Sequence, residues 1–594
     1  MVIPSSLKRL LTFKIKVPVL LVLCCSFLQF CSCDIFTAQV ELESIFDLRK
    51  SVSGAVVEYL RQEELRLALV REKFEISSGL SRIGVVDNGE EYRKKLLPGE
   101  DVSISGESEN YDILNPINAF LAIKALSVDL ADLVKHAMDN TNMKSFNKLM
   151  ESLSATRKFP DKDDLKGAAI ALTRLQDTYL LKTEDLSEGC LQDDFCTVTL
   201  SVQDCIEIGR QNYQERSYDH AIPWFEEALR KLDEQESHLY LNSNNNETNL
   251  EIPIKRGPPK PTKTPFFTEL SNQTRESQRE EIIEYISWSN DIKNTLSVGK
   301  QFLAELTGIE LDAFIDEVVK AAESQPTDGE AEDSYSTVLK KYEALCRGES
   351  RDFISQNPSL KCTLSTRANN PYFMIGPVKE EQLHVDPPLW VFHDVIYNSE
   401  IEVIKAISKP LFKTATVVNS ATGGTEQSTT RISKSAWVIN DDDDVVRRVN
   451  KRIMYLTNLD LYTAEDLQVA NYGIGGMYLP HFDFSHTNET IKFLPKEEGN
   501  RIATLMFYMS DVRVGGGTAF PHLNLTIWPE KGAAAFWYNL KPDGRGDYRT
   551  QHGACPVLIG SKWVSNKWIH ERGQEFIRPC ELQPNDAKSK NYNY

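Results

Sequence analysis

The chain has 594 residues, of which 41% are hydrophobic and 26% are charged. This composition is typical of soluble globular domains, so it argues against a wholly disordered or membrane-embedded protein, and the length predicts several domains. The formal net charge of −19 argues against a nucleic-acid-binding function, because such proteins carry basic surfaces.

The first 33 residues have the pattern of a secretory signal peptide. Four basic residues at positions 8, 9, 14 and 16 precede an apolar run at 17–28, and small residues follow at 31 and 33. A membrane-spanning helix needs roughly 20 apolar residues, which is longer than this run. We therefore expect cleavage before Asp34 and no membrane span.

Seven cysteines remain beyond this segment, and a secretory compartment would favour disulfides between them. Their clustering suggests the pairs Cys190 with Cys196, Cys346 with Cys362 and Cys555 with Cys580, and leaves Cys205 as a buried helical residue. Four Asn-x-Ser/Thr sequons are consistent with the same pathway, at Asn246, Asn272, Asn488 and Asn524.

Residues 36–190 have helical periodicity. An apolar stripe recurs at steps of three and four residues, formed by Ile45, Leu48, Val52, Val56 and Tyr59. Such a stripe fits either the core of a helical domain or the seam of a helix–helix dimer, and the pattern leaves both open.

A second helical unit is predicted at 199–235. Its alternation of small and large residues is typical of a tetratricopeptide helix pair, and it is formed by Gly209, Tyr218, Ala221, Phe225 and Ala228. The alternatives are an ordinary helical hairpin and a peptide groove lined by Tyr213 and Tyr218. Proline and polar residues at 236–280 predict an exposed loop or linker. Helical periodicity resumes at 281–346, with an interruption at 324–333.

Short β-rich runs dominate after about residue 385, with glycine and asparagine between them, which predicts a barrel or a double-sheet jelly roll. The run of aspartates at 441–444 suits the start of a helix better than a calcium site, because acidic residues favour the positive end of a helix. The predicted fold class is therefore α+β and multidomain, with helical and tetratricopeptide-like regions followed by a C-terminal double-stranded β-helix.

One short segment, 479–483, places a histidine and an aspartate two residues apart in a predicted strand. Side chains alternate along a strand, so His481 and Asp483 point to the same face. If the fold brings His552 beside them, the three side chains form the two-histidine, one-carboxylate set of non-haem Fe(II) oxygenases. A lone H-x-D pattern is weak, and His481 could instead pair with a neighbouring strand.

Nearby residues support this interpretation. Lys562, ten residues after His552, offers a fixed cation for a dicarboxylate, and His570 is a further candidate. On one straight strand these two residues lie roughly 26 Å apart, so both reach one cofactor only if the chain turns between them, and 565–566 is the expected turn. His486 would lie roughly 16 Å from His481 on the same strand, too far to share an ion. The glycines at 473–476 fit a tight turn.

These segments resemble the α subunit of collagen prolyl 4-hydroxylases. The resemblance is carried by "LQVANYGIGGMYLPHFDF", "NRIATLMFYMSDV", "FWYNL" and "WVSNKWIHERGQEFIRPC", spans about 385–582, and extends to "NPINAFLAIK" at 115–124 and to the helix pair at 199–235. By position, the resemblance places the family's iron ligands at His481, Asp483 and His552. It places the lysine that binds 2-oxoglutarate at Lys562 and the auxiliary histidine at His570. Tyr472 is a further expected cofactor-binding residue. The family's two disulfides near the catalytic region would be Cys346 to Cys362 and Cys555 to Cys580.

The resemblance implies hydroxylation of peptidyl proline at C4 in procollagen-like X-Pro-Gly sequences, with Fe(II), O2 and 2-oxoglutarate, giving succinate and carbon dioxide, and with L-ascorbate to maintain the iron. It also implies a protein disulfide isomerase β subunit as partner in an α2β2 tetramer of the endoplasmic reticulum lumen. Two alternatives remain: a related secretory-pathway hydroxylase of a non-collagen protein, and a non-catalytic peptide-binding subunit. The polar segment at 236–280 and the additional pair Cys190 and Cys196 depart from the family pattern.

The expected domains follow from these patterns: a signal peptide at 1–33, a helical N-terminal and dimerisation domain at 34–190, a tetratricopeptide-like peptide-binding region at 199–346, and a dioxygenase domain at 385–582.

Overall fold

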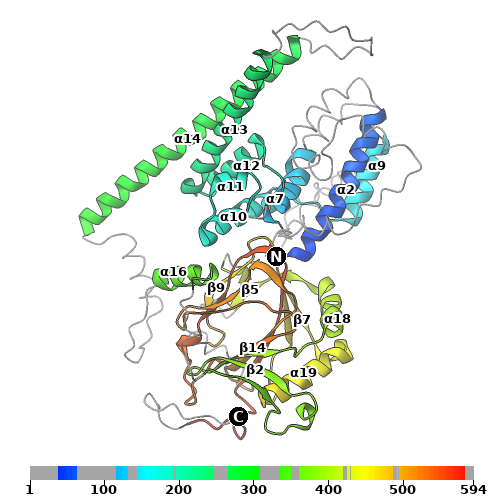
Figure 1. Ribbon diagram of the computed structural model, residues 1–594, viewed down its shortest axis with the longest axis vertical. Coiled ribbons are helices and arrows are strands. Elements are labelled where there is room, and N and C mark those ends of the chain that lie inside the picture. The colour runs from blue at the N-terminus through cyan, green and yellow to red at the C-terminus, as the bar shows by residue number, and fades with distance from the viewer. Residues whose placement is uncertain are drawn as a thin grey trace, which may run out of the picture.

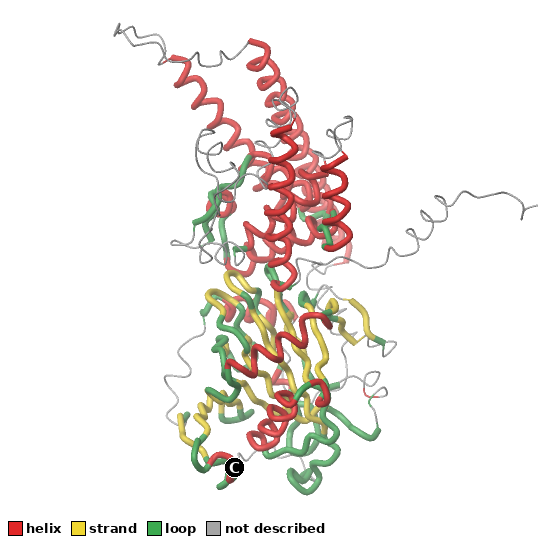
Figure 2. The backbone as a smooth tube through the Cα atoms, turned by 90° about the vertical axis from the view of Figure 1, so that its right-hand side faces the viewer, coloured by secondary structure: helices red, strands yellow, loops and turns green. Residues whose placement is uncertain are grey.

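The computed structural model divides into a helical half and a strand-rich half (Figures 1 and 2). The residues that it describes are 38–62, 115–131, 144–191, 196–244, 265–307, 335–349, 360–418, 424–427, 430–485, 491, 494 and 496–581. The predicted signal peptide, the interruption at 324–333, His486, Asn246 and Asn488 lie outside these residues. Within them, no helix combines the length and the apolar character that a membrane crossing requires.

The N-terminal helices form a single apolar core. They are α2 (Gln39–Gln62), α7 (Pro116–Lys124), α9 (Lys144–Thr156), α10 (Lys162–Tyr179) and α11 (Thr183–Ser187), with a π-helical turn, η3, at Ala125–Asp129. Ile45, Leu48, Val52 and Val56 are at most 1% exposed and belong to this core. These four residues of the α2 stripe therefore pack within the chain, which confirms the core interpretation for them, whereas the side chain of Tyr59 lies outside the described part of the structure.

The predicted helix pair is present as α12 (Val202–Gln214) and α13 (Tyr218–Asn244). A Cβ at Gly209 would lie 2.7 Å from the Phe225 ring, so the glycine lets the two helices approach and the aromatic ring fills the space between them. The predicted bounds of the loop at 236–280 are wrong at both ends, because α13 continues to Asn244 and α14 (Pro265–Thr307) begins well before residue 281. Both helices gain packing partners in the fold, because α14 lies along α13 and α12 (Figure 1).

The strand-rich half contains two main antiparallel sheets, as expected for a jelly roll. The larger sheet has nine strands in the order β1-β2-β3-β14-β10-β17-β8-β7-β4, and the smaller has four in the order β13-β12-β15-β9. The nine strands are β1 (Cys362–Ser365), β2 (Val378–His384), β3 (Leu389–His393), β14 (Ala534–Tyr538), β10 (Arg501–Tyr508), β17 (Lys562–His570), β8 (Leu467–Tyr472), β7 (Lys434–Val438) and β4 (Lys413–Thr414). The four are β13 (Leu525–Ile527), β12 (Thr518–Phe520), β15 (His552–Ala554) and β9 (Tyr478–His481).

Two further strand pairs and two helices complete this half. The pairs are β5 (Thr416–Val418) with β6 (Thr425–Gln427) and β11 (Val512–Gly515) with β16 (Val557–Gly560). Helices α18 (Asn398–Ser408) and α19 (Asp444–Thr457) share an apolar core with β8, β10 and β14. The Asp443 side chain accepts a hydrogen bond from the Val445 amide at 2.7 Å, which confirms that the aspartate run starts a helix.

The strands begin earlier than expected, at Cys362 instead of about 385, because β1 and β2 extend the edge of the larger sheet. Helix α16 (Tyr335–Cys346) was expected to belong to the peptide-binding region. Instead it packs against β9, β12 and β13 of the smaller sheet and against α10. A helix can be recognised from its own periodicity, but the surface that buries its apolar face cannot.

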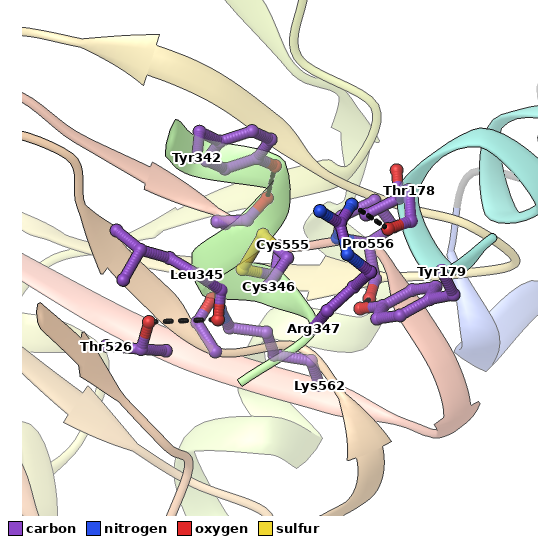
Figure 3. Close-up of a disulfide and its surroundings, with 12 residues drawn as sticks. Thr178, Tyr179, Tyr342, Leu345, Cys346, Arg347, Thr526, Cys555, Pro556 and Lys562 are labelled. Atoms are coloured by element: carbon purple, nitrogen blue, oxygen red, sulfur yellow. Dashed lines mark hydrogen bonds between the residues drawn. A yellow bond between two sulfur atoms is a disulfide. The ribbon is translucent and has the colours of Figure 1, made fainter. Parts of the chain in front are cut away.

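The disulfides differ from the expected pairing in one important respect. Cys190 with Cys196 is confirmed, and Cys205 is buried without a disulfide. Cys346, however, is bonded to Cys555 across 209 residues, while Cys362 and Cys580 are exposed thiols. The reason is the position of α16, which lies directly over the end of β15 (Figure 3). Pairing neighbours along the chain was therefore wrong for these four cysteines.

Helix α10 docks the helical half onto the strand-rich half. Its Arg174 guanidinium donates to the Gly475 carbonyl at 3.0 Å, and its Tyr179 hydroxyl donates to the Pro556 carbonyl (Figure 3). Gly475 has a φ of +54°, and a Cβ there would lie 2.9 Å from the Ala171 carbonyl oxygen. The tight turn expected at 473–476 is present, and α10 contacts it at Gly475.

Candidate metal and cosubstrate site

Strands β9 and β15 bring the two histidines of the site together. His481 and His552 are direct partners in the antiparallel register, with ring centroids 4.5 Å apart. Asp483 follows β9 by two residues, and its carboxylate oxygens lie 3.6 Å from His481 Nε2 and 3.7 Å from His552 Nε2. One ligand atom from each residue lies within 4.8 Å of the other two. The expected convergence of these three side chains is confirmed.

Backbone carbonyls orient both imidazoles. Nδ1 of His481 is 2.9 Å from the Leu479 carbonyl oxygen, and Nδ1 of His552 is 3.0 Å from the Thr550 carbonyl oxygen. A carbonyl oxygen only accepts hydrogen bonds, so Nδ1 carries the proton in each ring and Nε2 keeps a free lone pair. This is the usual way in which a protein presents Nε2 to a metal ion.

The charge state of the three side chains also suits a divalent cation. Burial lowers the pKa of His552 to about 4, so this imidazole is neutral at physiological pH. Burial raises the pKa of Asp483, but the neighbouring histidines and the Arg501 guanidinium outweigh this effect and hold it well below its usual range. The result is one carboxylate beside a neutral His552 imidazole, and with His481 these residue types form the donor set that favours Fe(II) and related ions.

Lys562 and Tyr472 lie opposite one another on β17 and β8, and line the same cavity as His481, Asp483 and His552. The Lys562 ammonium is 3.3 Å from the Gly517 carbonyl oxygen and 5.3 Å from the centre of the Tyr472 ring. Burial lowers its pKa to about 7. No carboxylate of the described residues forms an ion pair with it, so the ammonium is available for an anionic ligand.

His570 does not join this cavity. The turn expected at 565–566 is absent, because Ser565 and Asn566 pair in register with β10 and β17 runs unbroken from Lys562 to His570. His570 lies at the far end of the strand, where Nδ1 contacts the Gly499 carbonyl at 2.8 Å and Nε2 contacts Glu465 at 3.1 Å. The residues that line the cavity are Arg431, Tyr472, Tyr478, His481, Asp483, Met506, Thr518, Trp537, His552, Ala554, Lys562, Asn566 and Trp568.

His570 is connected to the cavity indirectly, through Glu465 and Arg501. Arg501 binds both oxygens of Glu465, donates to the Asp483 carbonyl at 3.2 Å and stacks 4.0 Å from the centre of the Trp568 ring. Sequence reasoning missed Arg501 and Trp568. Trp568 could have been found from strand alternation, because Lys562, Asn566 and Trp568 are separated by multiples of two residues and so lie on one face of a strand.

Thr504 and Asn539 were also missed. The Thr504 hydroxyl donates to Asp483 Oδ2 at 2.7 Å, and the Asn539 amide donates to the Thr504 hydroxyl oxygen at 2.9 Å. Thr504 lies on β10 and Asn539 directly follows β14, both remote from Asp483 along the chain, so no local pattern indicated this contact.

Three family models match the chain. They are the N-terminal region of the prolyl 4-hydroxylase alpha subunit at 85–193, the prolyl 4-hydroxylase peptide-substrate-binding domain at 202–244, and the 2OG-Fe(II) oxygenase superfamily at 467–570. The last of these ranges contains His481, Asp483, His552, Lys562 and His570.

Known proteins match over most of the chain. It is 37% identical over 567 residues to prolyl 4-hydroxylase subunit alpha-2 of Caenorhabditis elegans, which covers 93% of this chain and 94% of that relative. It is 39% identical over 494 residues to the human subunit alpha-1, which covers 79% of this chain and 84% of that relative. Among solved structures, a viral collagen prolyl hydroxylase from Paramecium bursaria Chlorella virus-1 has 27% identity and a TM-score of 0.26, over 31% of this chain and 95% of that one. Both relatives are more than 30% identical to this chain, over 93% and 79% of its length, which shows that this chain belongs to the prolyl 4-hydroxylase alpha-subunit family.

Proposed function

We propose that the chain is the catalytic subunit of a procollagen-proline 4-dioxygenase. The observation that carries this proposal is the convergence of His481, Asp483 and His552 within one cavity that also contains Lys562, a buried lysine without an ion pair among the residues that the structure describes. A three-residue metal face leaves coordination positions open, as Fe(II) oxygenases require, and Lys562 has the charge that a dicarboxylate cosubstrate needs.

Each residue has a defined task in this proposal. Nε2 of His481, Nε2 of His552 and the Asp483 carboxylate hold Fe(II), and Lys562 pairs with the distal carboxylate of 2-oxoglutarate beside the Tyr472 ring. Bound iron, with 2-oxoglutarate and O2, would supply the oxidising chemistry: one oxygen atom of O2 hydroxylates C4 of a peptidyl proline, the other enters succinate, and carbon dioxide is released. The aromatic walls, Trp537 and Trp568 among them, exclude water and orient the proline ring.

His570 has a supporting task. Because it contacts Glu465 and lies outside the cavity, we assign it to positioning: it fixes Glu465, which holds Arg501 against Trp568 and the Asp483 carbonyl. This differs from a direct contact with the cosubstrate, which would require the turn that β17 lacks.

Proline-rich, collagen-like polypeptide is the proposed substrate. The match to a peptide-substrate-binding domain at 202–244 supports this proposal. An aromatic cluster lies there: Tyr213 contacts Tyr218 and Tyr285 edge to face, with ring centroids 5.5 Å and 5.2 Å apart. Aromatic surfaces of this kind suit proline rings, which are apolar and conformationally restricted.

The setting of the reaction follows from the same assignment. We propose that the chain works in the lumen of the endoplasmic reticulum, as an α2β2 tetramer with a protein disulfide isomerase β subunit, and that L-ascorbate maintains its iron. The disulfides of the structure are consistent with an oxidising compartment. The N-terminal helices would then form the dimerisation domain, and the signal peptide and sequons would serve the secretory route.

The decisive experiment is co-expression with a disulfide isomerase, followed by an assay of 2-oxoglutarate-dependent hydroxylation of a (Pro-Pro-Gly)-repeat peptide. We expect turnover that requires Fe(II) and is abolished by His481→Ala, Asp483→Ala or His552→Ala. The matched control is His522→Ala, an exposed histidine outside the cavity, which should leave turnover intact. Turnover of a non-collagen proline peptide alone would assign a different substrate, and metal binding with no turnover of any peptide would indicate a non-catalytic subunit.

A further inference from the structure

The Asp483 carboxylate has a buried support that the assignment of metal-binding residues does not explain. Thr504, at the middle of β10, donates its hydroxyl to Asp483 Oδ2 at 2.7 Å. Asn539, at the end of β14, donates its side-chain amide to the Thr504 hydroxyl oxygen at 2.9 Å. Thr504 and Asn539 are each only 1% exposed, so water does not compete for either bond.

The direction of these two hydrogen bonds is fixed by charge. A hydroxyl has one hydrogen, and an anionic carboxylate is a much stronger acceptor than a neutral amide oxygen. Thr504 therefore donates to Asp483 and must accept from Asn539, which requires the amide nitrogen of Asn539 to face the hydroxyl. Asn539 Oδ1 is consequently left buried without a hydrogen-bond partner among the described residues. Such an unsatisfied oxygen costs free energy, of order 1–3 kcal/mol, so the orientation is not explained by stability alone.

The consequence concerns the geometry of the carboxylate. With Oδ2 held by Thr504, the plane of the Asp483 carboxylate cannot rotate freely. Oδ1, which is 3.6 Å from His481 Nε2, then remains for the metal ion. The bond also compensates part of the desolvation of a carboxylate that is 7% exposed.

We propose that Thr504 and Asn539 form a positioning relay that presents Asp483 to the metal ion. This inference rests on the proposed function, since it assumes that Asp483 is a ligand. Neither residue lines the cavity, so both act through Asp483. Residues that orient a metal ligand typically contribute a factor of about 10–100 in metal affinity.

The test is metal binding by the full-length chain, prepared as for the turnover assay, stripped of metal and titrated with Co(II) by visible absorption. Thr504→Val keeps the shape of the side chain and removes the hydroxyl, and we expect Co(II) affinity to fall by about tenfold. Thr504→Ser restores the hydroxyl and should return the affinity to within about twofold of the original, allowing for its freer rotamer. Asn539→Ala frees the Thr504 hydroxyl to rotate and should give a smaller loss.

Thr457→Val is the matched control. Thr457 is equally buried, at 2% exposed, and its hydroxyl donates to the Ile453 carbonyl within α19, away from the cavity. It should lower thermal stability slightly and leave Co(II) affinity unchanged. If Thr504→Val lowers only thermal stability, to the same extent as Thr457→Val, the relay is excluded and Thr504 is merely structural. If the unmodified chain itself binds no Co(II), the proposed metal site fails, which is a different result.

Discussion

Cys346 of α16 is bonded to Cys555, which directly follows β15 and lies three residues after His552, a proposed metal ligand. The same helix holds this segment by a hydrogen bond from the Tyr342 hydroxyl to the Ala554 carbonyl at 2.7 Å. A second hydrogen bond ties the helix to β13, where the Thr526 hydroxyl donates to the Leu345 carbonyl at 3.1 Å (Figure 3). Helix α16 is therefore a brace for β15, although it lies more than 200 residues earlier in the chain.

Removal of this disulfide should destabilise the chain. A bridge that closes so long a loop restricts the unfolded chain strongly, so Cys346→Ala with Cys555→Ala should lower the free energy of unfolding by about 2–5 kcal/mol. The control is Cys190→Ala with Cys196→Ala, where the bridge spans a separation of only six residues and the loss should be smaller. Thermal unfolding compares the two. Mass mapping of peptides under non-reducing conditions checks the connectivity, and bridges from Cys346 to Cys362 and from Cys555 to Cys580 would contradict it.

Binding of 2-oxoglutarate should weaken as pH rises through the range above 7. Burial lowers the pKa of the Lys562 ammonium to about 7 in the free protein, so the lysine loses its charge above that pH. Only the charged form pairs with a carboxylate, so binding takes up a proton, and the dissociation constant should rise about tenfold between pH 7 and pH 8.5. Calorimetric titration of the metal-loaded chain over this range measures the effect. In Lys562→Arg the guanidinium stays charged, so the pH dependence should be nearly flat; an equally steep curve would place the titration elsewhere.

Glu465→Gln should weaken both stability and peptide hydroxylation. Glu465 is the charged partner of Arg501, which contacts the Asp483 carbonyl and stacks on Trp568 in the cavity wall. Both members of the pair are partly exposed, so the expected loss in the free energy of unfolding is modest, about 1–2 kcal/mol. A larger effect is expected on kcat/KM for the peptide, because Trp568 loses its support. Asp394→Asn makes the same carboxylate-to-amide change in the exposed pair with Lys379 and should alter neither quantity. Equal effects of the two substitutions would exclude a positioning role.

Gly475→Ala should loosen the contact between the two halves of the molecule. The φ of +54° is unfavourable for alanine, and the new Cβ would meet the Ala171 carbonyl oxygen of α10 at 2.9 Å. We expect a loss of about 1–2 kcal/mol in the free energy of unfolding and faster proteolysis near the junction. Gly54→Ala is the control, because Gly54 lies inside α2 with no atom within 4 Å of a new Cβ. Alanine there should raise stability by about 0.5–1 kcal/mol. Similar behaviour of the two variants would mean that α10 does not rest on this turn.

The local periodicities of the sequence identified several elements correctly. The period of 3.6 residues predicted α2 and the α12–α13 pair, and the aspartate run predicted the start of α19, because these signals depend only on residues within one turn or two. Alternation along a strand likewise put His481 and Asp483 on one face. These inferences need no knowledge of the rest of the chain.

The remaining features depended on contacts between distant segments. The pairing of β9 with β15 decided that His552 lies beside His481. The continuity of β17 from Lys562 to His570, with 565–566 paired to both β8 and β10, placed His570 outside the cavity. The packing of α16 over β15 decided the partner of Cys346. The start of α14 before residue 281 is held by contacts with α12 and α13, from Gln278 to Gln203 and from Arg279 to Asp233. The sequence thus determined which residue types and periodicities were available, whereas the tertiary structure decided which side chains meet, because burial and strand register are set by the whole fold.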